Sequence, residues 1–116
     1  MTAEEVFCDL YDKYGEEFNW SMVPFSKAKG PLVDELKREL GKSHFLYDKT
    51  IYAVAKCDSA DDVLYVCDRE NDKDVYYIFH LTWSSQNEKG FPRYVKLTGI
   101  NAVKEYIETK YVSEYL

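Results

Sequence analysis

The chain lacks the features that mark secreted, membrane-spanning or disulfide-linked proteins. No apolar run approaches the roughly 20 residues that a membrane-spanning helix needs. The N-terminus is acidic, where a secretory signal would be basic and then apolar. The three cysteines are an odd number without CxxC spacing, so neither a disulfide framework nor a zinc knuckle is indicated. We therefore expect a soluble protein of the reducing cytoplasm with no contact to a membrane.

Cofactor-binding motifs are also missing. The five glycines are widely separated and form no phosphate-binding loop. No serine-hydrolase or metalloprotease signature occurs, and His44 and His80 lie far apart in the sequence. We expect no cofactor and no bound metal, although a site assembled from His80, Asp62 and a cysteine is geometrically conceivable.

Apolar and aromatic residues, by contrast, are plentiful. Hydrophobic residues make up 46% of the 116 positions, and they include eleven tyrosines and six phenylalanines. This composition excludes disorder and suits one core, so residues 1–116 are expected to form a single domain. One core of this size cannot hide every tyrosine with a bonded hydroxyl. Partial exposure is expected for Tyr52, Tyr76, Tyr94 and Tyr115.

The net charge is −6, and the acidic residues are unevenly distributed. Unassisted binding to nucleic acid is not expected, because phosphate repels an acidic surface. Residues 58–74 hold seven acids against only Arg69 and Lys73. Such a concentration of one sign would attract a basic protein partner. The alternative is that these acids belong to ordinary solvated turns, which favour aspartate.

Residue periodicity predicts three helices. Apolar residues recur at helical spacing from Thr2 to Phe18, and Thr2 with Glu5 forms a capping box. A second helix should begin at Gly30-Pro31 and end at Gly41. The segment from 19 to 24 interrupts the pattern between these helices. A third helix is expected over 101–111.

The period then changes to that of strands between the second and third helices. The strands are predicted at Ile51–Cys57, Asp62–Cys67, Val75–Trp83 and Arg93–Thr98. Consecutive strands with short turns predict a four-stranded antiparallel meander in an α+β fold of order α-α-β-β-β-β-α.

Short turns also fix a register, in which Cys57 lies opposite Asp62 and Asp62 lies opposite His80. One face, expected to form the main core under the helices, then carries Val54, Val63, Tyr65, Val75, Tyr77, Phe79, Leu81, Trp83, Val95 and Leu97. The other carries Ile51, Ala53, Ala55, Leu64, Val66, Tyr76 and Ile78 and ends in Cys57, Asp62, His80 and Thr82. If this second face is open, its alanines could form a homodimer surface.

Cys57, Asp62 and His80 are the strongest candidates for chemistry. A thiol, a carboxylate and an imidazole with neighbouring Cβ atoms would suit a cysteine nucleophile site. However, a working triad places the imidazole between the nucleophile and the carboxylate, and here the carboxylate is central. The alternative is a structural Asp62–His80 hydrogen bond beside a buried Cys57.

The loop after Trp83 is polar until Phe91, and these two aromatic residues bracket it. Aromatic side chains beside a polar loop often anchor protein interfaces, although both could instead pack into the core. We therefore expect a binding corner rather than a catalytic one. Its members are predicted to be Asp62, His80, Thr82, Trp83, Phe91 and Tyr76.

Two segments carry a resemblance to known sequences. Asp61-Asp62-Val63-Leu64-Tyr65, followed by Ile78-Phe79-His80-Leu81-Thr82-Trp83-Ser84, resembles a family of small bacterial proteins with a "DDVL … HLTWS" pattern. The resemblance covers residues 57 to 95, and the HLTW element is its most specific part. The family has no assigned activity, so the resemblance implies a soluble bacterial protein and pairs Asp62 with His80 as motif members.

These observations favour a small acidic protein-binding module, and an immunity-type protein that neutralises a basic toxin is one form it could take. Two alternatives stay open. The first is a hydrolase or transferase that uses Cys57, Asp62 and His80. The second is a structural homodimer without catalytic activity.

Overall fold

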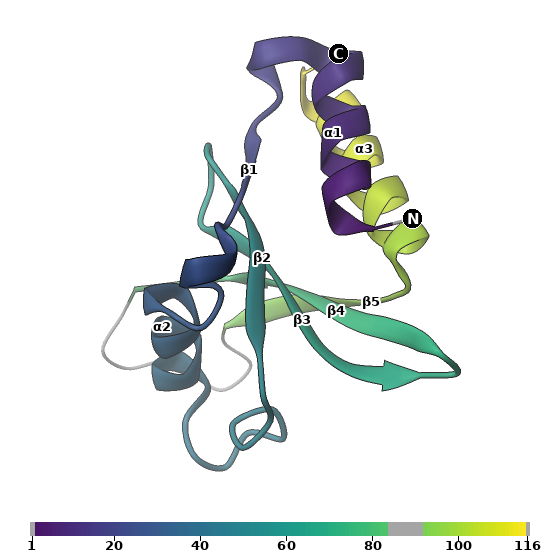
Figure 1. Cartoon of the computed structure of the whole chain (residues 1–116). Coiled ribbons are helices and arrows are strands. Elements are labelled where there is room, and N and C mark those ends of the chain that lie inside the picture. The colour runs from purple at the N-terminus through teal and green to yellow at the C-terminus, as the bar shows by residue number, and fades with distance from the viewer. Residues whose placement is uncertain (1, 84–91, 116) are drawn as a thin grey trace.

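A computed structural model describes residues 2–83 and 92–115, and it shows three helices around one sheet (Figure 1). The elements in chain order are α1 (Ala3–Tyr14), η1 (Gly15–Glu17), β1 (Trp20–Met22), η2 (Phe25–Lys27), α2 (Pro31–Leu40), β2 (Tyr52–Cys57), β3 (Asp62–Glu70), β4 (Lys73–His80), β5 (Arg93–Thr98) and α3 (Ile100–Tyr115), where η1 and η2 are short 3₁₀ helices. All strand pairs are antiparallel, in the order β1-β2-β3-β4-β5. The predicted α+β class, with three α-helices and an antiparallel sheet, is confirmed.

The predicted number of strands is wrong, because β1 adds a fifth strand between the first two helices. The observed order of helices and strands is therefore α-β-α-β-β-β-β-α. Trp20 pairs with Cys57 and Met22 pairs with Ala55, so β1 extends the edge of the sheet at β2. Three residues are too few to show an alternating pattern, which is why the sequence indicated only a break here.

The helix ends follow local signals. The Thr2 side chain accepts a hydrogen bond from the Glu5 backbone, and the Glu5 carboxylate accepts one from Thr2 N–H, so the predicted capping box is present. Pro31 occupies the first turn of α2, and Gly41 ends that helix with a φ of 76°. None of the described helices has both the length and the apolar composition that a membrane crossing requires.

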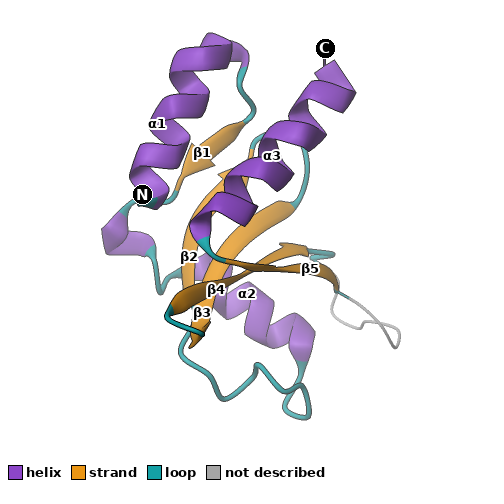
Figure 2. Ribbon diagram, turned by 90° about the vertical axis from the view of Figure 1, so that its right-hand side faces the viewer, coloured by secondary structure: helices purple, strands orange, loops and turns teal. Residues whose placement is uncertain are grey.

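Helices cover both faces of the sheet. Figures 1 and 2 show α1 and α3 side by side over one face and α2 on the opposite face. The first core, between the sheet and the pair α1/α3, contains Val6, Phe7, Leu10, Phe18, Trp20, Ala55, Cys57, Leu64, Tyr76, Ile78, Val103, Ile107 and Tyr111. The second core, beneath α2, contains Val33, Leu36, Leu40, Leu46, Ile51, Ala53, Val63, Tyr65, Cys67, Val75, Tyr77, Phe79 and Leu81. One main core under all three helices was expected, and this expectation is wrong.

An irregularity in β2 changes the predicted faces. The β2–β3 register shifts between Ala53 and Ala55, so these two alanines belong to different cores. The predicted register puts Ile51 and Ala53 on the same face of the sheet as Leu64. In the structure Leu64 packs in the first core, whereas Ile51 and Ala53 pack in the second. Both alanines are buried, at 3% and 0% exposure, so they offer no surface for a dimer.

The last strand was also assigned to the wrong face. Val95 pairs with Ile78 and Leu97 pairs with Tyr76, so their side chains lie on the side of the first core. Val54 likewise packs against the first core rather than the second. The register of β5 against β4 could not be predicted, because the long loop between these strands does not fix it.

Candidate functional site

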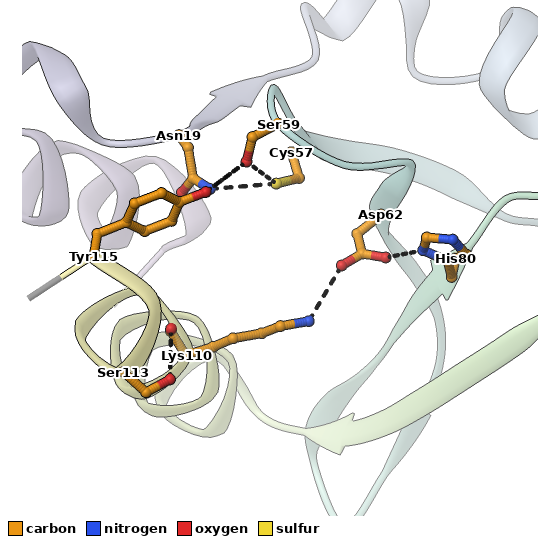
Figure 3. Close-up of polar contacts among 8 residues, drawn as sticks. All are labelled: Asn19, Cys57, Ser59, Asp62, His80, Lys110, Ser113 and Tyr115. Carbon is orange, nitrogen blue, oxygen red and sulfur yellow. Dashed lines mark hydrogen bonds and ion pairs between the residues drawn. The ribbon is translucent and has the colours of Figure 1, made fainter.

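The predicted neighbours Asp62 and His80 do meet at one end of the sheet. Asp62 begins β3, His80 ends β4, and the two residues are directly paired. The distance between His80 Nδ1 and Asp62 Oδ1 is 2.8 Å (Figure 3). Asp62 is buried, whereas 56% of the His80 side chain is exposed. The carboxylate therefore holds one ring nitrogen in place and leaves the imidazole at the surface.

A third residue contacts Asp62, at the carboxylate oxygen that His80 does not contact. Lys110 of α3 places its Nζ 3.4 Å from Asp62 Oδ2, so the carboxylate lies between an ammonium and an imidazole (Figure 3). Burial is the largest single influence and would lower the pKa of Lys110. The charge and hydrogen bond of Asp62, together with the charges of Tyr106 and Glu114, outweigh it and raise that pKa above the usual lysine value. A buried carboxylate with two such partners ties the C-terminal helix to the end of the sheet.

Cys57 lies apart from the imidazole, on the opposite side of Asp62 (Figure 3). Its Sγ is 3.6 Å from both Asn19 Nδ2 and Ser59 Oγ, and Asn19 also donates to Ser59 at 2.7 Å. The Tyr115 hydroxyl lies 3.0 Å from Ser59 Oγ and closes this polar cluster. The thiol is therefore held among neutral hydrogen-bonding groups, and the order that a catalytic triad needs is not formed among the described residues.

Thr82 and Trp83 are held by a residue that the sequence did not single out. The carboxylate of Glu39, near the end of α2, accepts hydrogen bonds from Thr82 N (2.7 Å), Thr82 Oγ1 (2.8 Å) and Trp83 N (3.1 Å). Glu39 is only 6% exposed, whereas Trp83 is 50% exposed and has a φ of 56°. The buried carboxylate thus fixes the chain at the point where it leaves the sheet.

Hydrogen bonding determines the charge of Glu39. Burial alone would raise the pKa of Glu39, but hydrogen bonds from Glu35, Thr82 and Trp83 outweigh it and hold that pKa below the usual glutamate value. The pKa of the neighbouring Glu35 carboxyl is shifted in the opposite direction. Burial raises the pKa of Glu35, and its contact with Glu39 adds to the increase, although Arg38 opposes it. Of the two carboxyl groups, Glu39 is therefore the one whose surroundings favour the ionised form.

Three aromatic rings meet at the surface beyond the end of α2. His44 stacks on Phe45 with a centroid distance of 4.7 Å, and Tyr94 of β5 lies 6.5 Å from both rings. Phe45 is 58% exposed and Tyr94 is 44% exposed. We call His44, Phe45 and Tyr94 the aromatic surface. Burial lowers the pKa of His44 below the usual histidine value, which favours the neutral ring.

The predicted exposure of tyrosines is confirmed for Tyr52, Tyr94 and Tyr115, which are 38%, 44% and 50% exposed. For Tyr76 it is wrong, because this residue is 6% exposed and packs in the first core. Tyr76 is therefore removed from the expected binding residues. Phe91 lies outside the described residues.

Most acids of the β3–β4 hairpin have cationic partners within the chain. Lys49 pairs with Asp68 at 2.8 Å, Lys96 pairs with Glu70 at 2.9 Å, and Arg69 pairs with Asp74 at 3.3 Å. These pairs are exposed, so each contributes little to stability. They nevertheless reduce the local excess of negative charge that residues 58–74 suggested.

The comparisons with known proteins identify no relative. No family model, no curated protein and no solved structure matches the chain. The resemblance to the small bacterial family therefore stays a prediction. Within residues 2–83 and 92–115, no three His, Cys, Asp or Glu side chains gather closely enough to hold a metal ion.

Proposed function

We propose that this chain is a small protein-binding module and that the aromatic surface is its main contact with a protein partner. The observation that carries the proposal is the exposure of Phe45 and Tyr94 within one cluster of contacting rings. Exposed aromatic side chains supply much of the binding energy in protein interfaces. Because helices cover both faces of the sheet, the central strands offer no open face for binding, and a contact with a partner must lie elsewhere.

The exposed rings of the aromatic surface pack against aromatic rings of the protein interior. Tyr94 packs against Phe79 at a centroid distance of 5.1 Å, and Phe45 packs edge-on against Tyr77 at 6.4 Å. Both supporting rings belong to the second core. The surface rings therefore lose little conformational freedom on binding, which favours affinity. Glu39, near the end of α2, also holds the exposed Trp83, and the Trp83 side chain would enlarge the contact with the partner.

A basic partner suits the charge of the whole chain. The net charge of −6 would steer a cationic protein toward this one, although the hairpin acids are largely paired internally. The exposed acids of α1, such as Glu4 and Asp12, supply negative charge elsewhere. An immunity-type role, in which the module neutralises a basic toxin by covering it, combines these requirements without catalysis.

The enzymatic alternative has less support. Cys57 and His80 lie on opposite sides of Asp62, so the imidazole does not face the thiol that it would have to activate (Figure 3). Cys57 is also buried, at 4% exposure, where a substrate would have little access.

The proposal can be tested by affinity capture with matched variants. The wild-type chain, Phe45→Ala, Tyr94→Ala and a control, Val112→Ala, would each be immobilised on a resin and exposed to native lysate at low and high salt. Val112 is a suitable control because it is also exposed, at 39%, but lies on α3, outside the aromatic surface. We expect one protein to be retained by the wild type and by Val112→Ala and lost from the two other variants.

The captured protein would then be purified and its affinity measured. Loss of either ring is expected to weaken binding at least about tenfold, as for a typical hot-spot residue. A basic partner should also bind more weakly at high salt. Equal retention by all four proteins, or retention of none at low salt, would contradict the proposal.

A further inference from the structure

Phe25 is the most exposed large apolar side chain of the described residues. It lies in η2 with 94% of its surface accessible, beside a pocket of about 640 Å³. The pocket is lined mainly by apolar side chains, among them Met22, Val23, Ala28, Tyr52, Val54 and Val66. A protruding aromatic side chain next to an apolar pocket marks an interaction surface.

The path of the chain explains how this pocket forms. After Met22 the chain leaves the sheet, so the half of β2 that begins at Tyr52 pairs with β3 on one side and has no strand on its outer edge. Two backbone hydrogen bonds compensate there, from Val23 N to Val54 O (2.9 Å) and from Ala53 N to Ala28 O (2.8 Å). These bonds already occupy the polar groups that an added strand would need. The open pocket therefore suits an apolar side chain rather than a strand.

The rim of the pocket carries one charge of each sign. Glu4, in the first turn of α1, lines one side, and Lys29 places its Nζ 5.0 Å from the centroid of the Tyr52 ring. Neither residue forms an ion pair within residues 2–83 and 92–115. Opposite charges on one rim are self-complementary, because a two-fold axis brings each sign against the other.

We propose that two copies of this chain associate about a two-fold axis through the pocket. Each copy inserts Phe25 into the apolar pocket of the other, and Lys29 faces Glu4 of the partner subunit. The same surface supplies the protruding ring, the pocket that receives it and both charges, as an isologous interface requires. This dimer uses none of the residues of the aromatic surface, so it goes beyond the proposed function and does not depend on it.

Sedimentation velocity of the full chain over a range of concentrations tests the association. We expect a concentration-dependent dimer in the wild type and in the control Val112→Ala, whose side chain is exposed on α3 and does not line the pocket. Phe25→Ala should raise the dimer dissociation constant at least about tenfold. The change should leave the fold intact, because the side chain is almost fully exposed. A wild-type chain that stays monomeric, or a Phe25→Ala variant that dimerises equally well, would overturn the proposal.

A charge exchange tests the two-fold arrangement. Lys29→Glu and Glu4→Lys should each weaken the dimer, because each places like charges together at both ends of the interface. The double variant restores opposite charges and should recover most of the lost affinity. Failure of this recovery would overturn the arrangement. Capture of a different protein by the pocket of a monomeric wild-type chain, with loss of that protein in Phe25→Ala, would likewise overturn self-association.

Discussion

At the scale of single residues, the three cysteines differ sharply in their surroundings. Cys8 is exposed on α1, whereas Cys57 and Cys67 are each 4% exposed. Burial raises the pKa of Cys67, and the nearby Asp68 adds to this effect. Because the thiolate is the reactive form, this cysteine has both poor access and a low population of its nucleophilic state.

We therefore expect iodoacetamide to modify Cys8 first and Cys67 last in the folded protein at neutral pH. Mass spectrometry of peptides taken during the reaction would measure the three rates. In a Cys8→Ser control, most of the rapid labelling should disappear, and denaturant should expose the other two thiols. A Cys57 that reacts faster than Cys8 would contradict this order and would favour the cysteine-nucleophile hypothesis.

The contacts of Asp62 show which side-chain pairs a sequence can reveal. His80 could be predicted as its neighbour because a short turn between consecutive strands fixes the register. Lys110 could not, because its approach depends on how α3 is positioned against the sheet. Glu39 was missed for the same reason. A glutamate near a helix end usually faces solvent, and only packing turns this one toward Thr82.

At the scale of elements, the Glu39 carboxylate joins α2 to the end of β4. Replacement by glutamine keeps the shape but removes the charge, and it places an N–H₂ group where an oxygen accepted a hydrogen bond. We expect Glu39→Gln to lower the free energy of unfolding by about 1–3 kcal/mol at pH 7. Chemical denaturation of both proteins would measure the difference, and Glu105→Gln on the exposed side of α3 is the matched control.

The difference between the wild type and Glu39→Gln should also depend on pH. The pKa of Glu39 is lower in the folded state, so its contribution is fully present above the unfolded pKa of about 4.3. It should be lost as the pH falls through the lower folded pKa. The stability curves of the two proteins should therefore converge in acid, whereas a constant difference down to pH 2 would show that the charge is not responsible.

The lengths of the strands and of their connections explain the errors in the predicted sheet. The four longer strands were identified because each is long enough to show β-periodicity, and short turns join the first three of them. β1 was missed because it has three residues and is recognisable only by its pairing with β2. The register shift between Ala53 and Ala55 moves one side chain to the other face, and small residues of similar polarity give no sign of such a change.

At the scale of the whole molecule, the two cores share one sheet. Side chains along β3 alternate between them, so that Leu64 packs in the first core while Val63 and Tyr65 pack in the second. The Tyr65 hydroxyl also donates a 2.7 Å hydrogen bond to Leu32 O of α2. Neither core can lose its packing while the central strands keep the geometry that the other requires.

This coupling predicts one cooperative unfolding transition. Leu10 of α1 and Leu36 of α2 are both fully buried, one in each core. Leu10→Ala and Leu36→Ala should each lower the free energy of unfolding by about 2–5 kcal/mol, because each leaves a cavity. In a Trp83→Phe background, fluorescence would report only Trp20 in the first core, while far-UV circular dichroism would report the whole chain.

The two signals should change at the same denaturant concentration in the background protein and in both variants. The decisive comparison is Leu36→Ala, because its cavity lies in the core that Trp20 does not contact. If the cores unfolded independently, this variant would shift the circular dichroism and leave the Trp20 transition unchanged. Coincident shifts would instead show that β3 and β4 transmit the loss of packing from the α2 side of the sheet to the α1 and α3 side.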